Sequence, residues 1–82
     1  MKPIKILLVD DRVSALRAIQ TFLEKEGYEV IAANSGQMAM ELFREHLNFD
    51  IVLSDLKMPG MDGLALYRSL KRLDEHLLLV IM

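Results

Sequence analysis

The stretch of sequence that decides the fold lies near the amino terminus and reads Ile4-Lys5-Ile6-Leu7-Leu8-Val9-Asp10-Asp11. It is short, rich in branched apolar side chains and ended by two acidic residues. A run of this kind is typical of a strand buried on both faces, as in a parallel sheet, rather than of a helix. We therefore expect the first strand of a parallel sheet here.

Helical and strand-like patterns alternate along the rest of the chain. Apolar residues three or four apart run from Val13 until Gly27, a residue that favours the left-handed end of a helix. Further strands are expected at 28–33, 49–54 and 77–82, and further helices around 39–47 and 66–73, with Asn34-Ser35-Gly36 as candidate caps. This alternation with short connections predicts an α/β fold, a doubly wound parallel sheet with helices on both faces.

The composition indicates one small globular domain and excludes several functions. The chain has 82 residues, of which 52% are hydrophobic and 27% charged, so it is expected to fold. Its net charge of -2 is too balanced for direct binding to nucleic acid or to an anionic membrane. The absence of cysteine excludes disulfides and thiolate metal sites. The apolar run near the amino terminus is too short for a signal peptide or a membrane span, so a cytoplasmic protein is expected.

Acidic residues follow two of the expected strands. Asp10 and Asp11 follow the first strand and Asp55 follows the third. Ligand sites of open parallel sheets lie beyond the carboxyl ends of the strands, so the three carboxylates converge if these strands are neighbours. Anions placed so close together either take up protons or share a cation. An all-oxygen set suits a hard ion, and Mg²⁺ is the simplest choice.

A metal ion beside a carboxylate is also the arrangement that phosphoryl transfer to that carboxylate requires. Asp55 would then be the nucleophile and would form an aspartyl phosphate. The alternative is that Asp10, Asp11 and Asp55 only cap helices and turns, where aspartate is common. Spacing by itself leaves both interpretations open.

Two motifs resemble those of a known family. They are Val9-Asp10-Asp11 after the first strand, and Ile51-Val52-Leu53-Ser54-Asp55-Leu56-Lys57-Met58-Pro59-Gly60-Met61-Asp62-Gly63 after an interval that is typical of that family. Over residues 4–82 the chain resembles the receiver domain of two-component response regulators. The resemblance implies a flavodoxin-like sheet with strand order 2-1-3-4.

The resemblance also implies a site and a partner. A sensor histidine kinase or a histidine phosphotransfer protein would donate a phosphoryl group to Asp55, and this event would switch an output. Asp11, Asp55 and the backbone carbonyl of Lys57 would bind Mg²⁺ directly, and Asp10 would act mainly through a bound water. Any catalysis would be limited to the chain's own phosphorylation and dephosphorylation, not turnover of a separate substrate.

The sequence departs from the family pattern at its carboxyl end. Family members continue with a Ser or Thr after the fourth strand, then an aromatic residue and a Lys in and after a fifth strand. We therefore expect 1–82 to be the amino-terminal part of a receiver domain that lacks its last helix, strand and helix. The alternative function is a receiver-like fragment that takes no phosphate and acts as a protein-interaction or oligomerisation module. Its exposed edge at 77–82 would favour a homodimer or a domain swap.

Arg12 is a further departure. It stands directly after the acidic pair, where family members often carry an acid, and its positive charge would weaken metal binding slightly. An arginine at the start of a helix is more commonly just solvated, and a solvated side chain is what we expect.

Overall fold

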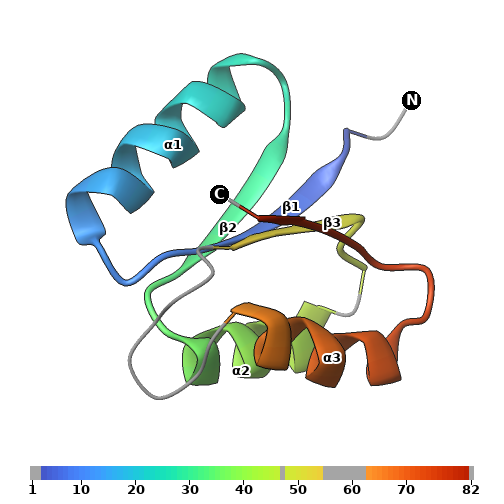
Figure 1. Cartoon of the computed structure of the whole chain (residues 1–82). Coiled ribbons are helices and arrows are strands. Elements are labelled where there is room, and N and C mark those ends of the chain that lie inside the picture. Colours follow the sequence, from blue (N-terminus) through green and yellow to red (C-terminus); the bar gives the residue numbers. More distant parts are fainter. Residues whose placement is uncertain (1–2, 47, 55–62, 82) are drawn as a thin grey trace.

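The structure is a computed structural model that describes residues 3–46, 48–54 and 63–81. Within these ranges strands and helices alternate along the chain, as the sequence predicts (Figure 1). The strands are β1 (Lys5–Val9), β2 (Glu29–Ala33), β3 (Ile51–Ser54) and β4 (Leu78–Ile81). The helices are α1 (Val13–Lys25), α2 (Gly36–His46) and α3 (Gly63–Leu73).

The strands form one parallel sheet in the order β2-β1-β3-β4. This is the strand order that the resemblance implies. Val9 at the end of β1 is the register partner of Ala33 in β2 and of Ser54 in β3. The carboxyl ends of these three strands therefore finish side by side at one edge of the sheet.

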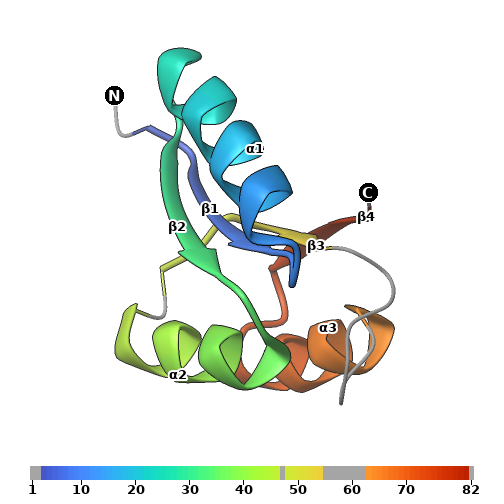
Figure 2. The ribbon, with the colours of Figure 1, turned by 90° about the vertical axis from the view of Figure 1, so that its left-hand side faces the viewer.

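Helices cover both faces of the sheet, with α1 on one face and α2 and α3 on the other (Figure 2). Successive side chains of a strand point to opposite faces, and β1 is apolar on both. Leu7 and Val9 belong to the core under α2 and α3, while Ile6 and Leu8 belong to the core under α1. The continuous apolar run at the start of the chain is thus explained by burial on both sides.

The predicted helix signals at Gly27 and Ser35 have their expected roles. Gly27 has a φ of 96°, and two backbone bonds close the end of α1: Gly27 N–H donates to Glu24 O and Tyr28 N–H to Leu23 O. At the start of α2, Ser35 Oγ accepts a hydrogen bond from Met38 N–H at 3.1 Å.

The predicted third strand begins later than expected. Phe49 precedes β3, which starts at Ile51, because Phe49 serves the core instead of the sheet. Its ring is 3% exposed and stacks on Phe43 with 5.8 Å between the ring centroids. An apolar run therefore marked a buried segment correctly but did not separate the strand from the loop before it.

The face of β4 on the α1 side of the sheet carries exposed apolar side chains. Leu78 and Val80 are the register partners of Ile51 and Leu53, and they are 61% and 46% exposed. In the described part of the chain, β4 is also an edge strand of the sheet. No helix within the same residues has both the length and the apolarity that crossing a membrane requires.

Candidate functional site

The buried polar side chains of the described residues lie at the carboxyl ends of β1 and β3. They are Asp10 and Ser54, and both have no exposed surface. Asp10 directly follows Val9, and Val9 pairs in register with Ser54, so two neighbouring strands bring polar groups to the same edge. A buried carboxylate requires compensating partners, and this edge is where parallel sheets of this class bind their ligands.

Arg12 supplies the partners of the Asp10 carboxylate. Asp10 Oδ1 accepts hydrogen bonds from the backbone N–H of Arg12 at 2.9 Å and from its Nε at 3.1 Å. Asp10 Oδ2 accepts one from Arg12 Nη2 at 2.9 Å. These bonds hold the pKa of Asp10 below its ordinary value, with the Arg12 side chain as the largest cause, although burial acts in the opposite direction. Asp10 is therefore an anion at neutral pH.

This contact corrects the expectation for Arg12. Its side chain is 64% exposed, as a helix-start arginine was expected to be, but its guanidinium is bonded to a fully buried carboxylate. The chain turns between β1 and α1, and this turn carries Arg12 back over Asp10. The Asp-x-Arg spacing is the only sign of this pair in the sequence, and it is too common a pattern to predict one.

Of the three other predicted site residues, the structure describes only Asp11. Asp11 is exposed beside Asp10. Asp55 and Lys57 lie outside the described residues, so the predicted convergence of three carboxylates is not tested. The described ranges contain no group of three or more acidic, histidine or cysteine side chains able to hold a metal ion.

The donor set that is described fits a hard cation. Asp10 and Asp11 offer carboxylate oxygens, which are the ligands that hard cations prefer. The predicted ligand set includes no nitrogen or sulfur atom. The depressed pKa of Asp10 keeps its carboxyl group ionised, as a metal-binding carboxylate must be. His76 is exposed, with its Nε2 3.7 Å from the Glu75 carboxylate. The side chain of His46 lies outside the described residues.

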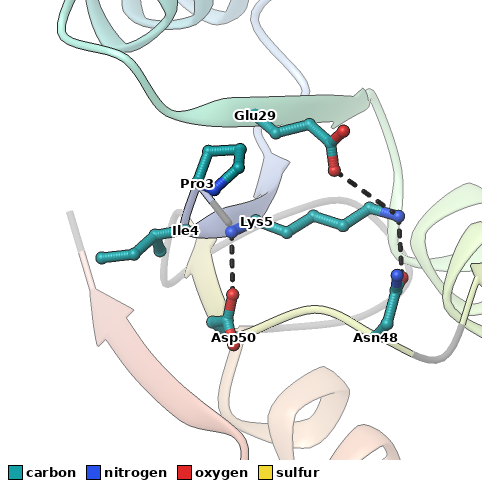
Figure 3. Close-up of a pocket in the computed structure, with 6 residues that line it drawn as sticks. All are labelled: Pro3, Ile4, Lys5, Glu29, Asn48 and Asp50. Atoms are coloured by element: carbon teal, nitrogen blue, oxygen red, sulfur yellow. Dashed lines mark hydrogen bonds and ion pairs between the residues drawn. The ribbon is translucent and has the colours of Figure 1, made fainter. Parts of the chain in front are cut away.

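A cavity of about 600 Å³ lies at the opposite, amino-terminal edge of the sheet (Figure 3). Lys5 lines this cavity. The Nζ of Lys5 donates a 2.7 Å hydrogen bond to Asn48 Oδ1 and lies 3.8 Å from Glu29 Oε2. Asp50 bonds the backbone N–H of Lys5 through Oδ2 at 2.9 Å. These contacts pair the charged and polar groups of the cavity with one another, and they link the beginnings of the neighbouring strands. The cavity therefore lacks a buried carboxylate like that of Asp10.

Comparison with known proteins supports the family assignment. The family model described as "Response regulator receiver domain" matches residues 6–82. The transcriptional regulatory protein ZraR of Escherichia coli (strain K12) is 43% identical over 79 residues, which are 96% of this chain and 18% of that protein. Sporulation initiation phosphotransferase F of Bacillus subtilis (strain 168) is 36% identical over 78 residues, 95% of this chain and 62% of that protein.

A solved structure has the same architecture. The response regulator protein TrrA of Thermotoga maritima, solved in complex with Mg(2+)-BeF, superposes with a TM-score of 0.87 at 29% identity, over 95% of this chain and 67% of that one. The chain spans less than a fifth of the length of ZraR and less than two thirds of the Bacillus protein. With the parallel sheet, its strand order and the matched motifs, these findings show that the chain belongs to the response regulator receiver domain family.

Proposed function

We propose that this chain is a phosphoacceptor signalling module of a two-component system, with Asp55 as the residue that is phosphorylated. The observation that carries the proposal is the buried, anionic Asp10 at the carboxyl end of β1, beside the end of β3. Asp55 follows β3 directly in the sequence. The family to which the chain belongs supports the same assignment.

The proposed reaction moves one phosphoryl group between two side chains. The donor is a phosphohistidine on a sensor histidine kinase or a histidine phosphotransfer protein. A carboxylate oxygen of Asp55 attacks phosphorus, the P–N bond breaks as the P–O bond forms, and the released imidazole takes a proton from solvent. While Asp55 is phosphorylated, the added charge biases the output. Hydrolysis later releases inorganic phosphate and restores the Asp55 carboxylate. The whole of 1–82 is assigned to this one receiver unit, in the cytoplasm, where such kinases present their phosphohistidine.

The proposed cofactor is Mg²⁺. Asp11, Asp55 and the backbone carbonyl of Lys57 would bind it, with Asp10 acting through a water. When bound, Mg²⁺ neutralises charge that develops on the oxygens of the transferred group. The Mg(2+)-BeF complex of TrrA supports this choice, and so do the carboxylate oxygens of Asp10 and Asp11. Asp10 itself remains charged and oriented by its bond from Arg12 N–H.

Intact mass spectrometry after incubation with Mg²⁺ and acetyl phosphate tests this function. The expected result is an adduct of one phosphoryl group that is lost in Asp55→Asn and retained in Asp74→Asn. Asp74 is a matched control because it lies in the turn after α3, where its Oδ1 accepts a bond from His76 N–H that asparagine can also accept. An adduct that survives in Asp55→Asn would contradict the assignment of the phosphoacceptor.

A second function is favoured by the exposed apolar side chains of β4. Leu78 and Val80 lie on an edge strand of the described sheet, a position that invites pairing with another chain. In this case the chain would act as an interaction or oligomerisation module that takes no phosphate. Absence of any adduct, together with self-association of the unmodified protein, would favour this alternative.

A further inference from the structure

The guanidinium of Arg12 spans both oxygens of Asp10. Nε bonds Oδ1 at 3.1 Å and Nη2 bonds Oδ2 at 2.9 Å, which is the bidentate geometry in which arginine binds carboxylates most strongly. The backbone N–H of Arg12 adds a third bond to Oδ1. Oδ1 therefore uses both of its lone pairs on Arg12, and Oδ2 uses at least one.

The two partners of this pair differ in their contact with water. The Asp10 side chain has no exposed surface, whereas that of Arg12 is 64% exposed. Arg12 precedes α1 as its N-cap residue but makes no side-chain cap bond, so α1 does not depend on its guanidinium. Because the Arg12 side chain already faces water, moving its guanidinium away from Asp10 buries no charge, and the Asp10 carboxylate would keep its bond from the Arg12 N–H.

The pair also changes the charge that this edge of the sheet presents. Arginine keeps its positive charge at any pH at which the protein folds. It cancels the charge of Asp10, whereas Asp11 has no such cationic partner within the residues that the structure describes. A divalent cation arriving at this edge therefore meets one net negative charge from Asp10, Asp11 and Arg12, where the acidic pair by itself would present two.

We propose that Arg12 is an internal counter-cation of the site, whose guanidinium holds the Asp10 carboxylate until a hydrated divalent cation displaces it. This inference rests on the proposed function, which places Mg²⁺ beside Asp10 and Asp11. Arg12 is a positioning residue in this scheme, since it acts on the metal site through its bonds to the Asp10 carboxylate. Its effect is to weaken the binding of Mg²⁺ and to keep the metal-free acidic residues neutralised.

Calorimetric titration of the metal-free chain with MgCl₂ at constant ionic strength tests the competition. Arg12→Gln removes the charge and retains a long polar side chain, so Mg²⁺ should bind about tenfold more tightly than to the unaltered protein. Arg17→Gln is the matched control because Arg17 is an exposed arginine of α1 outside the site, and it should alter the affinity less than twofold. An Arg12→Gln affinity within twofold of that of the unaltered protein would overturn the inference.

Nuclear magnetic resonance of the arginine side chains gives a second test that needs no variant. In the metal-free protein the Arg12 Nε–H should exchange more slowly with solvent than that of Arg17, because it donates to a buried carboxylate. Addition of Mg²⁺ should accelerate this exchange and shift the resonance of Arg12 but not that of Arg17. If Mg²⁺ shifts the Asp11 amide and leaves the Arg12 Nε–H unchanged, displacement does not occur.

These measurements separate the failure of the inference from the failure of the proposed function. Equal Mg²⁺ affinities of Arg12→Gln and the unaltered protein overturn the inference and do not contradict the phosphoacceptor function. Mg²⁺ binding that tightens in Arg12→Gln, without a phosphoryl adduct on Asp55, supports the inference and overturns the function. Absence of Mg²⁺ binding to both proteins overturns the inference and the metal part of the function together.

Discussion

Replacing Asp10 by asparagine or by alanine separates its charge from its role in the turn between β1 and α1. Asparagine keeps Oδ1 and can still accept the 2.9 Å bond from Arg12 N–H, but it lacks the charge. Alanine lacks both and leaves that N–H without its side-chain partner. Because Arg12 is 64% exposed, it can be solvated when its carboxylate is removed, and the substitution also removes the cost of burying the Asp10 charge, so the two effects partly cancel.

The magnitudes follow from these contacts. We expect Asp10→Asn to lower the free energy of unfolding by no more than about 1 kcal/mol, since losing the charged bonds is partly offset by burying a neutral amide instead of a carboxylate. We expect Asp10→Ala to lower it by about 2–3 kcal/mol, because it also loses the turn bond and leaves a small void. The second loss is substantial for a chain of this size, whose total stability should be about 4–12 kcal/mol.

Urea unfolding followed by circular dichroism, with EDTA present, measures both losses. The corresponding changes at Asp74 are the control, because Asp74 accepts the same type of turn bond from His76 N–H at 3.0 Å and has no arginine partner among the described residues. Asp74→Ala should cost less than about 1 kcal/mol at this less buried position. A loss in Asp10→Asn as large as that in Asp10→Ala would refute the reasoning, because the charge and not the turn bond would then dominate.

Three further outcomes are expected. Since Arg12 lowers the pKa of Asp10 below its ordinary 3.8, the stability that this carboxylate contributes is present above pH 3.8 and lost as the pH falls further. Acid titration of the unfolding free energy should therefore be flatter in Asp10→Asn below that pH than in the unaltered protein. Gly27→Ala should lower the free energy of unfolding in urea by about 1 kcal/mol, because φ is 96° although nothing lies within 4 Å of the added Cβ. Gly27→Asn should lower it less, since asparagine tolerates this backbone conformation better. Equal losses in the two variants would argue against a backbone cause. Light scattering should show that the 82-residue polypeptide self-associates through β4. The double substitution Leu78→Lys and Val80→Lys should reduce this self-association. A monomer in dilute solution before any substitution would contradict the prediction.

Much of the fold was predictable because its signals are local. The apolar run of β1 has the composition of a strand covered on both sides, and Leu7 and Leu8 are indeed buried under opposite layers of helix. Gly27 and Ser35 act through neighbouring backbone groups, so their roles also could be read from the chain. Boundaries were less predictable, as Phe49 shows, because burial in a core and burial in a strand leave the same apolar pattern.

The candidate site was predicted by residue type and only partly by geometry. The carboxylates after β1 were predicted to be functional, which stays a prediction, and Asp10 is fully buried at the expected edge of the sheet. The assignments of Asp55 and Lys57 remain predictions. The Arg12 contact was missed because it depends on how the chain turns after Asp10, and the sequence carries no separate signal for that turn.

Alternation of strand and helix, and acids placed directly after strands, were determined by the sequence alone, since each depends on residues close together in the chain. The tertiary structure decided which strands are neighbours, that Val9 and Ser54 end side by side, and that a solvent-facing arginine holds the buried Asp10. These features depend on sheet register and on the path of one turn, so they arise only when distant segments pack together.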